Sequence, residues 1–139
     1  MSENTHYDKV CTAVIVQKGR SVLLGKITSS GVGNGTWTFP IGIREDHQRG
    51  LRFLARKTNE ETGLYIEFPF FCFAGYTFDD FGNGLRLMTL YYNARIVSGN
   101  LGNGTRNISE WRFFTWEGFP QPLFAPVKNF MKKYRSAIA

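Results

Sequence analysis

Four charged residues lie close together in the sequence at a spacing that would place them on one side of a helix. Arg56 with Glu60, and Lys57 with Glu61, form i,i+4 pairs, and such pairs are neighbours on a helix surface. Two adjacent glutamates repel each other unless a cation neutralises them. A divalent metal ion held by oxygen ligands would do this, and so would a tethered lysine. The spacing therefore indicates either a metal site or an internally neutralised helix surface, and leaves both open.

The surrounding chain predicts the elements that must position these charges. Residues 37–40 (WTFP) predict a short strand closed by proline, and a loop follows from Gly42. The next segment, 51–62, predicts an amphipathic helix. Its small and apolar residues recur at i, i+3, i+4 and i+7, at Leu51, Leu54, Ala55 and Thr58. Gly63 follows at the position where a left-handed residue ends helices.

Residues 42–64 resemble the Nudix box. The usual box is a glycine, five residues, a glutamate, seven residues and then Arg-Glu-apolar-x-Glu-Glu-x-Gly-apolar. An ungapped match places the first glycine at Gly42, the arginine at Arg56, the paired glutamates at Glu60 and Glu61, and the end at Gly63 and Leu64. Six box elements at the right spacing make the resemblance specific.

The resemblance extends over nearly the whole chain. Residues 35–40 (GTWTFP) are similar to the family's approach to the box. Near the other end, Trp111, Trp116 and residues 120–124 (PQPLF) are similar to a MutT-like branch that acts on purine nucleoside triphosphates.

Three positions depart from the box: Gln48 replaces its first glutamate, Lys57 the glutamate after the arginine, and Ile41 the glycine before Gly42. In the family, the glutamate at the Lys57 position ligates metal or serves as the base. An ammonium group cannot ligate Mg²⁺ and repels it. The acidic residues that related proteins often carry before the last strand are also missing, and Glu110 is the one acid that remains nearby.

The resemblance implies an α/β protein with the Nudix fold, in which a mixed sheet lies between helices, as a single domain over residues 1–139. It implies hydrolysis of nucleoside triphosphates or other nucleoside diphosphate-X compounds, with Mg²⁺ or Mn²⁺ activating a water for attack at phosphorus. The catalytic candidates are Gln48, Arg56, Lys57, Glu60 and Glu61. The candidate metal ligands are Glu60, Glu61, Ile41 and Glu45. The candidate substrate-binding residues are Trp37, Arg44 and Trp111.

Several of these residues also have a purely structural interpretation. Lys57 either holds phosphate or keeps the site collapsed, and in both cases we expect an ion pair with Glu61 or Glu60. Glu45 is a substitute carboxylate or an exposed loop acid, and His47 is a base or a solvated loop residue. The rings of four residues could stack a base or lie in the core, namely Trp37, Phe39, Trp111 and Phe124, and for Phe39 and Phe124 we expect the core. Asp79 and Asp80 are expected to shape a hairpin tip.

The other elements are predicted from pattern alone. Apolar, β-branched runs predict strands at 10–17, 22–27, 65–78, 85–96 and 111–116. A turn sequence at 79–84 (DDFGNG) predicts a hairpin tip. The segment 124–138 predicts a second helix with a basic outer face.

Composition sets limits on the class of protein. With 139 residues, 42% hydrophobic and 20% charged, the chain matches an ordinary globular domain rather than a disordered or coiled-coil protein. The net charge of +6 favours polyanionic partners. Cys11 and Cys72 are expected to be reduced core residues. No apolar run approaches membrane-spanning length, and the polar N-terminus predicts no signal peptide, so we expect a cytoplasmic protein.

Three hypotheses follow. The first is a MutT-like Nudix hydrolase with weakened or altered activity, because two box glutamates are Gln48 and Lys57. The second is a catalytically inactive Nudix domain that binds a nucleotide or a protein partner. The third, a nucleic-acid-binding module on the basic surface, has no supporting motif. We therefore expect a small-molecule nucleotide as partner rather than nucleic acid or membrane, and a monomer or homodimer.

Overall fold

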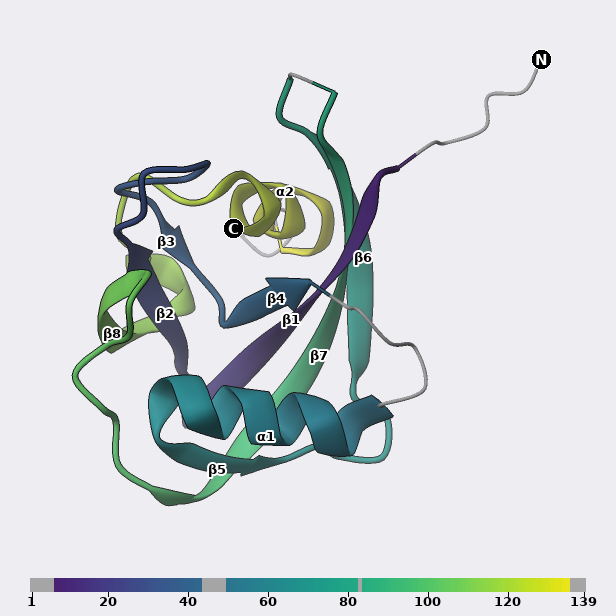
Figure 1. Ribbon diagram of the computed structural model, residues 1–139. Coiled ribbons are helices and arrows are strands. Elements are labelled where there is room, and N and C mark those ends of the chain that lie inside the picture. The colour runs from purple at the N-terminus through teal and green to yellow at the C-terminus, as the bar shows by residue number, and fades with distance from the viewer. Residues whose placement is uncertain (1–6, 44–49, 83, 136–139) are drawn as a thin grey trace.

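The computed structural model describes residues 7–43, 50–82 and 84–135. In chain order the elements are β1 (Lys9–Lys18), β2 (Ser21–Ile27), β3 (Trp37–Thr38), β4 (Ile41–Ile43), α1 (Gly50–Thr62), β5 (Leu64–Glu67), β6 (Phe73–Asp80), β7 (Arg86–Gly99), β8 (Ile108–Thr115), a 3₁₀ turn η1 (Trp116–Gly118) and α2 (Ala125–Tyr134) (Figure 1).

The eight strands form one mixed sheet. β1 and β7 run parallel along its centre, and β5 and β6 both pair antiparallel with the long β7. β1 and β2 pair only next to their tight turn, beyond which β4 pairs with β1, while β3 and β8 pair with β2. The strand before the box helix is thus hydrogen-bonded to the centre of the sheet.

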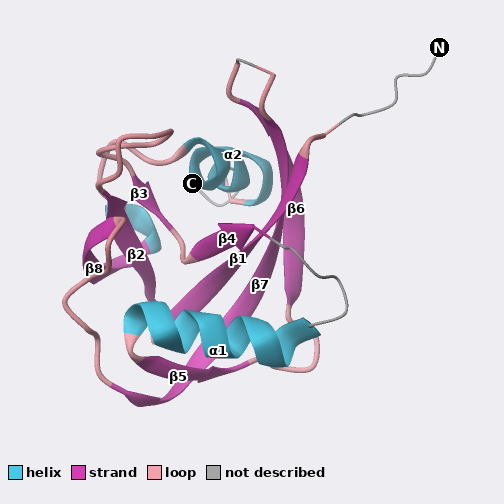
Figure 2. Cartoon of the chain, in the orientation of Figure 1, coloured by secondary structure: helices cyan, strands magenta, loops and turns pink. Residues whose placement is uncertain are grey.

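The two helices cover opposite faces of this sheet, as Figure 2 shows. Successive side chains of a strand point to opposite faces, and β1 follows this rule. Ala13 and Ile15 pack with residues of α2, whereas Val14 and Val16 pack in a second core with Leu54 and other residues of α1. The predicted α/β class, with a mixed sheet between helices, is confirmed.

The prediction of one strand over 65–78 is wrong. β5 ends at Glu67 and β6 begins only at Phe73, with a loop between them. Pro69 lies in this loop, and proline cannot donate the backbone hydrogen bond that a continuous ladder needs. The two short strands pair with different halves of β7, at residues 95–99 and 86–92.

Other boundaries lie near the predicted ones. The box helix begins one residue earlier than expected, at Gly50. α2 ends at Tyr134, and residues 136–138 of the predicted helix lie outside the described ranges. The cysteines are core residues as predicted, since Cys11 and Cys72 are buried free thiols. Within the described ranges, no helix is both long and apolar enough to cross a membrane.

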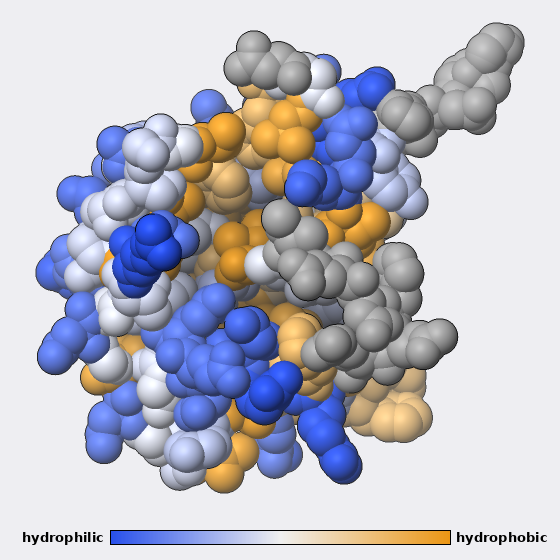
Figure 3. Space-filling view, viewed as in Figure 1, coloured by the Kyte–Doolittle hydropathy of each residue, from blue (hydrophilic) through white to orange (hydrophobic). Residues whose placement is uncertain are grey.

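The loop between β5 and β6 exposes two adjacent phenylalanines. Phe70 and Phe71 are 89% and 87% exposed, and their rings contact each other at 4.7 Å. Hydrophobic atoms project at the lower right of Figure 3, near the place of this loop in Figure 1. These side chains therefore contribute little to the core.

Replacing Phe70 and Phe71 together by serine is expected to change the free energy of unfolding by less than about 0.5 kcal/mol, as for other surface positions. Urea denaturation measures this. Phe39→Ala is the matched control, because Phe39 is fully buried and its loss should cost about 3–5 kcal/mol. A double serine variant as unstable as Phe39→Ala would show that the loop is packed.

Candidate functional site

The C-terminal end of α1 is fixed by side-chain and backbone contacts of the box segment. The hydroxyl of Thr58 donates to the carbonyl of Leu54, and that of Thr62 donates to the carbonyl of Thr58. The Thr62 hydroxyl also accepts a hydrogen bond from the backbone N–H of Leu64. These bonds join the last turn of α1 to the start of β5.

Gly63 ends the helix in the left-handed region, with φ of +85°. A Cβ atom at this position would lie 2.3 Å from the carbonyl oxygen of Asn100, so only glycine fits. The backbone N–H of Gly102 donates to the carbonyl of Thr62, which ties the same turn to the loop before β8. The predicted helix-ending role of Gly63 is confirmed.

Trp111 supports the same turn from β8. Its indole Nε1–H donates to the carbonyl oxygen of Glu61 at 3.1 Å, and only 7% of the residue is exposed. The ring lies against Gly25, where a Cβ would be 2.6 Å from Trp111 Cζ3. A buried tryptophan thus positions the backbone of one box glutamate.

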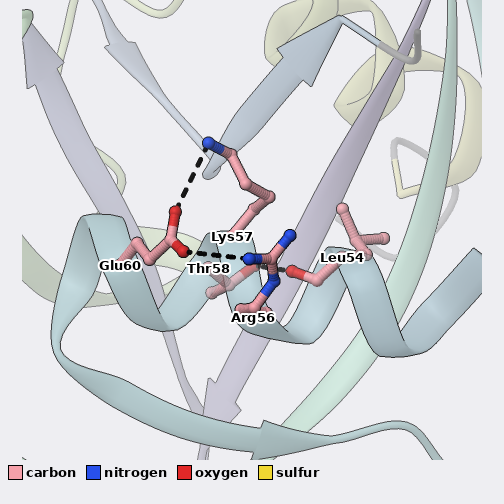
Figure 4. Close-up of polar contacts among 5 residues, drawn as sticks. All are labelled: Leu54, Arg56, Lys57, Thr58 and Glu60. Atoms are coloured by element: carbon pink, nitrogen blue, oxygen red, sulfur yellow. Dashed lines mark hydrogen bonds and ion pairs between the residues drawn. The ribbon is translucent and has the colours of Figure 1, made fainter. Parts of the chain in front are cut away.

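Glu60 is neutralised by Arg56 and Lys57 on the same helix (Figure 4). Its Oε1 lies 3.4 Å from Lys57 Nζ, and its Oε2 lies 3.7 Å from Arg56 Nη1. The Arg56–Glu60 pair expected from i,i+4 spacing is present. Lys57 forms its ion pair with Glu60, one of the two expected partners. About half of each side chain is exposed, so the pairs themselves add little to stability.

Glu61 has a different environment. It is half-buried, and no ion pair to its carboxylate is formed by a residue of the described ranges. Burial raises the pKa of Glu61 above the ordinary 4.5, Lys57 opposes this rise by its positive charge, and Glu60 adds to it. A carboxylate with a raised pKa that still ionises is suited to accept a proton from water.

Replacing Glu61 by glutamine is expected to stabilise the fold at neutral pH. A raised pKa means that the folded protein binds this proton more tightly than the unfolded chain does. The resulting stabilisation is complete below the ordinary pKa of 4.5 and is lost as the pH rises through the raised value. Urea denaturation should therefore give Glu61→Gln a higher free energy of unfolding than the wild type at neutral pH and the same free energy of unfolding in acid. Glu60→Gln is the matched control, and an advantage for Glu61→Gln that persists in acid would contradict this cause.

The predicted substrate-binding tryptophans are packed into the protein. Trp37 is 8% exposed and meets Phe114 edge-on at 5.2 Å, and its backbone joins it to Pro122 and Phe124. The ring of Trp111 packs over Gly25, and its indole N–H is bonded to the carbonyl of Glu61. Neither ring offers an open face on which a base could stack. The prediction that Phe39 and Phe124 are core residues is confirmed.

Of the remaining predicted residues, four lie outside the described ranges, and two, Ile41 and Glu110, lie within them. Arg44, Glu45, His47 and Gln48 lie outside the described residues. Ile41 is half-buried on β4 and pairs with Ala13 of β1. The carboxylate of Glu110, considered as a substitute ligand, lies 2.6 Å from the guanidinium of Arg112 on the same strand.

The fit of the carboxylates to a metal ion is limited. Among the described residues, no three histidine, cysteine, aspartate or glutamate side chains are grouped so that they could hold a metal ion. Glu60 is neutralised by two cations, which leaves Glu61 as the available carboxylate. One carboxylate suits a Mg²⁺ ion that arrives on the phosphates of a nucleotide, because Mg²⁺ is usually bound through one or two carboxylates, phosphates and water.

One buried polar group was missed by the sequence analysis. Asp79 does not shape the hairpin tip, because it is 6% exposed and accepts hydrogen bonds from Asn129 and, at 3.3 Å, from Thr77. Burial raises its pKa. Asp80 does cap the tip, since its Oδ1 accepts from the N–H of Gly82 at 2.9 Å. The sequence alternation along β6 would place Asp79 outside, because Tyr76 and Phe78 lie on the exposed side and Thr77 and Asp79 on the buried side, so no signal in the sequence identifies it.

Comparison with solved structures shows a shared fold. A MutT Nudix hydrolase from Burkholderia pseudomallei matches 92% of this chain and 98% of its own at 19% identity, with a TM-score of 0.74. The MutT protein from Methanosarcina mazei Go1 matches 99% of both chains at 16% identity and a TM-score of 0.76. A UDP-X diphosphatase matches 98% of this chain and 66% of its own at 12% identity and 0.70. No family model matches the chain.

Proposed function

We propose that this chain, which has the Nudix fold, is a MutT-like hydrolase that cleaves the phosphoric anhydride bonds of nucleoside triphosphates or other nucleoside diphosphate-X compounds. The observation that carries the proposal is the pair of box glutamates on the last turn of α1, of which Glu61 is not neutralised by Arg56 or Lys57. The fold supports the same class of reaction, since solved structures that share it include MutT proteins and a UDP-X diphosphatase.

Each box residue has a distinct role in this proposal. Glu61 accepts a proton from the attacking water, since its half-buried carboxylate forms no ion pair with Arg56 or Lys57. Arg56 and Lys57 neutralise Glu60 and so reduce the negative charge that approaching phosphates would meet. Hydrophilic side chains cover the outward surface of α1 (Figure 3), which keeps this end of the helix open to a charged substrate.

The metal requirement follows from the same residues. Glu61 is the carboxylate available to Mg²⁺ or Mn²⁺ carried by a nucleotide, with Glu45 and Ile41 as further candidate ligands. When bound, such an ion neutralises phosphate charge and lowers the pKa of a bound water. Lys57 repels it, and this supports weaker or altered activity than a complete box would have.

Turnover tests the proposal. The protein is incubated with nucleoside triphosphates, oxidised nucleotides and nucleotide sugars, first in Mg²⁺ and then in Mn²⁺, and products are resolved by ion-exchange chromatography. Metal-dependent products that vanish in Glu61→Ala support a hydrolase and identify its substrate. Products that persist in Glu61→Ala come from a contaminating enzyme, and no product from any substrate contradicts the proposal.

The second candidate is a catalytically inactive Nudix domain that binds a nucleotide or a protein partner. The Lys57–Glu60 ion pair favours it, because a cation already occupies part of the box. Nucleotide binding that is equally tight with Mg²⁺ and with a chelator, without turnover, would support this candidate. In both cases we propose a cytoplasmic protein, monomeric or homodimeric, without a nucleic-acid or membrane partner.

A further inference from the structure

A cavity of about 270 Å³ lies on the α2 side of the sheet. Its apolar wall includes Ile15 of β1 and Phe130 of α2, which belong to the core between the sheet and α2. The box helix packs on the opposite face, against the alternate residues of β1. The cavity is therefore separated from Glu60 and Glu61 by the sheet itself.

Two amides form the polar wall of this cavity. Gln17 lies on β1 and Asn93 on the neighbouring β7, and both side chains are half-buried. In the parallel register of these strands, Asn93 is the partner of Ile15, two residues before Gln17. Gln17 Nε2 donates to Asn93 Oδ1 at 3.0 Å. This bond uses one N–H of Gln17 and the carbonyl of Asn93, so the carbonyl oxygen of Gln17 and the amino group of Asn93 form no hydrogen bond with another side chain of the described residues, and both residues line the cavity. An acceptor beside a donor complements the edge of a nucleobase, which also presents a donor beside an acceptor.

A cation lies at the same cavity. The guanidinium of Arg135 is 3.8 Å from the centre of the Trp116 ring, and both residues line the cavity. Phe119 stacks on Trp116 at 5.2 Å, which fixes the ring that Arg135 lies over. Within the described residues, no carboxylate forms an ion pair with Arg135. A positioned guanidinium of this kind is suited to a phosphate group.

We propose that this cavity is a second ligand site, which binds a planar nitrogen heterocycle that carries an anionic group, as in a nucleoside monophosphate. The base edge pairs with the Gln17–Asn93 amides, its apolar surface packs against the half-buried Ala74 of β6 and Tyr134 of α2, and the phosphate binds Arg135. The volume of about 270 Å³ lies just below the roughly 300–1,000 Å³ of typical ligand pockets, so the site takes a small ligand rather than a dinucleotide. The site does not require the box to be catalytically active.

Nuclear magnetic resonance of the full chain, ¹⁵N-labelled, tests the site. AMP, CMP, GMP and UMP are titrated in the presence of a metal chelator, with ribose 5-phosphate and the four nucleosides as matched probes. At least one nucleotide should shift the side-chain amide signals of Gln17 and Asn93 and the indole signal of Trp116. Ribose 5-phosphate, which lacks the base, and the nucleosides, which lack the phosphate, should bind at least about tenfold more weakly.

Variants separate the cavity from the box. Arg135→Gln and Asn93→Leu should each weaken nucleotide binding by about tenfold, the cost of one strong hydrogen bond. Gln17→Met is a second variant at the half-buried end of β1, and the same spectra report whether each variant is folded. Glu61→Gln should leave the dissociation constant unchanged. Cavity signals that do not move with any nucleotide at millimolar concentration, or shifts confined to α1, would overturn the inference.

Discussion

Restoring the two missing box glutamates is expected to raise Mg²⁺-dependent turnover by at least about 100-fold, the lower end of what a general base contributes. The variant is Gln48→Glu combined with Lys57→Glu. It removes the ammonium group that pairs with Glu60 at 3.4 Å, and it places a carboxylate on the turn before Glu60 and Glu61. Initial rates of product formation, with and without Mg²⁺, measure the effect.

Lys57→Met is the control for this variant. It removes the positive charge without adding a ligand, so it should free Glu60 from Lys57 but restore little activity. Isothermal titration of Mg²⁺ into both variants shows whether the added carboxylate binds metal. A folded double variant that neither binds Mg²⁺ nor gains activity would contradict the assignment of the box to these residues.

Removing the Trp111 side chain is expected to destabilise the fold strongly. Trp111→Ala should lower the free energy of unfolding by about 3–5 kcal/mol, as for other buried aromatic residues. Trp111 is 7% exposed, packs over Gly25 and holds the carbonyl of Glu61. Its loss should therefore also loosen the last turn of α1. Urea denaturation measures the stability, and amide exchange of residues 59–63 measures the loosening.

Trp111→Phe distinguishes support of the helix from contact with substrate. Phenylalanine keeps an aromatic ring but lacks the indole N–H, so the variant should lose about 1 kcal/mol for one neutral hydrogen bond, together with a packing cost. If Trp111 acts only through Glu61, the variant should lower kcat and leave substrate affinity close to that of the wild type. A large loss of affinity with unchanged kcat would favour the base-stacking role that the sequence suggested.

The box helix could be predicted from the sequence because its contacts are local. Glu60 lies three and four residues from Lys57 and Arg56, so a helix alone brings the charges together. The end of the helix at Gly63 follows from a single left-handed residue. The resemblance to the Nudix box added the fold, which the comparisons with solved structures confirm.

The parts that sequence patterns did not resolve depend on distant contacts. Lys57 has Glu60 and Glu61 within reach at i,i+3 and i,i+4, and helix geometry alone does not decide that it pairs with Glu60. Asp79 looks like a turn residue because Asp80 and two glycines follow it, yet Asn129 of α2 binds it from fifty residues away. Its burial is set by the packing of α2 on β6, which no local pattern records.

The role of Glu61 in hydrolysis is tested by comparing Glu61→Gln with Glu60→Gln in Mg²⁺-dependent hydrolysis of the preferred substrate. Two cations neutralise Glu60, whereas Glu61 keeps an ionisable carboxylate with a raised pKa. We expect Glu61→Gln to lower kcat by about 100-fold or more and Glu60→Gln to have a much smaller effect. Equal losses in the two variants, or a greater loss in Glu60→Gln, would contradict the assignment of Glu61 as the working carboxylate.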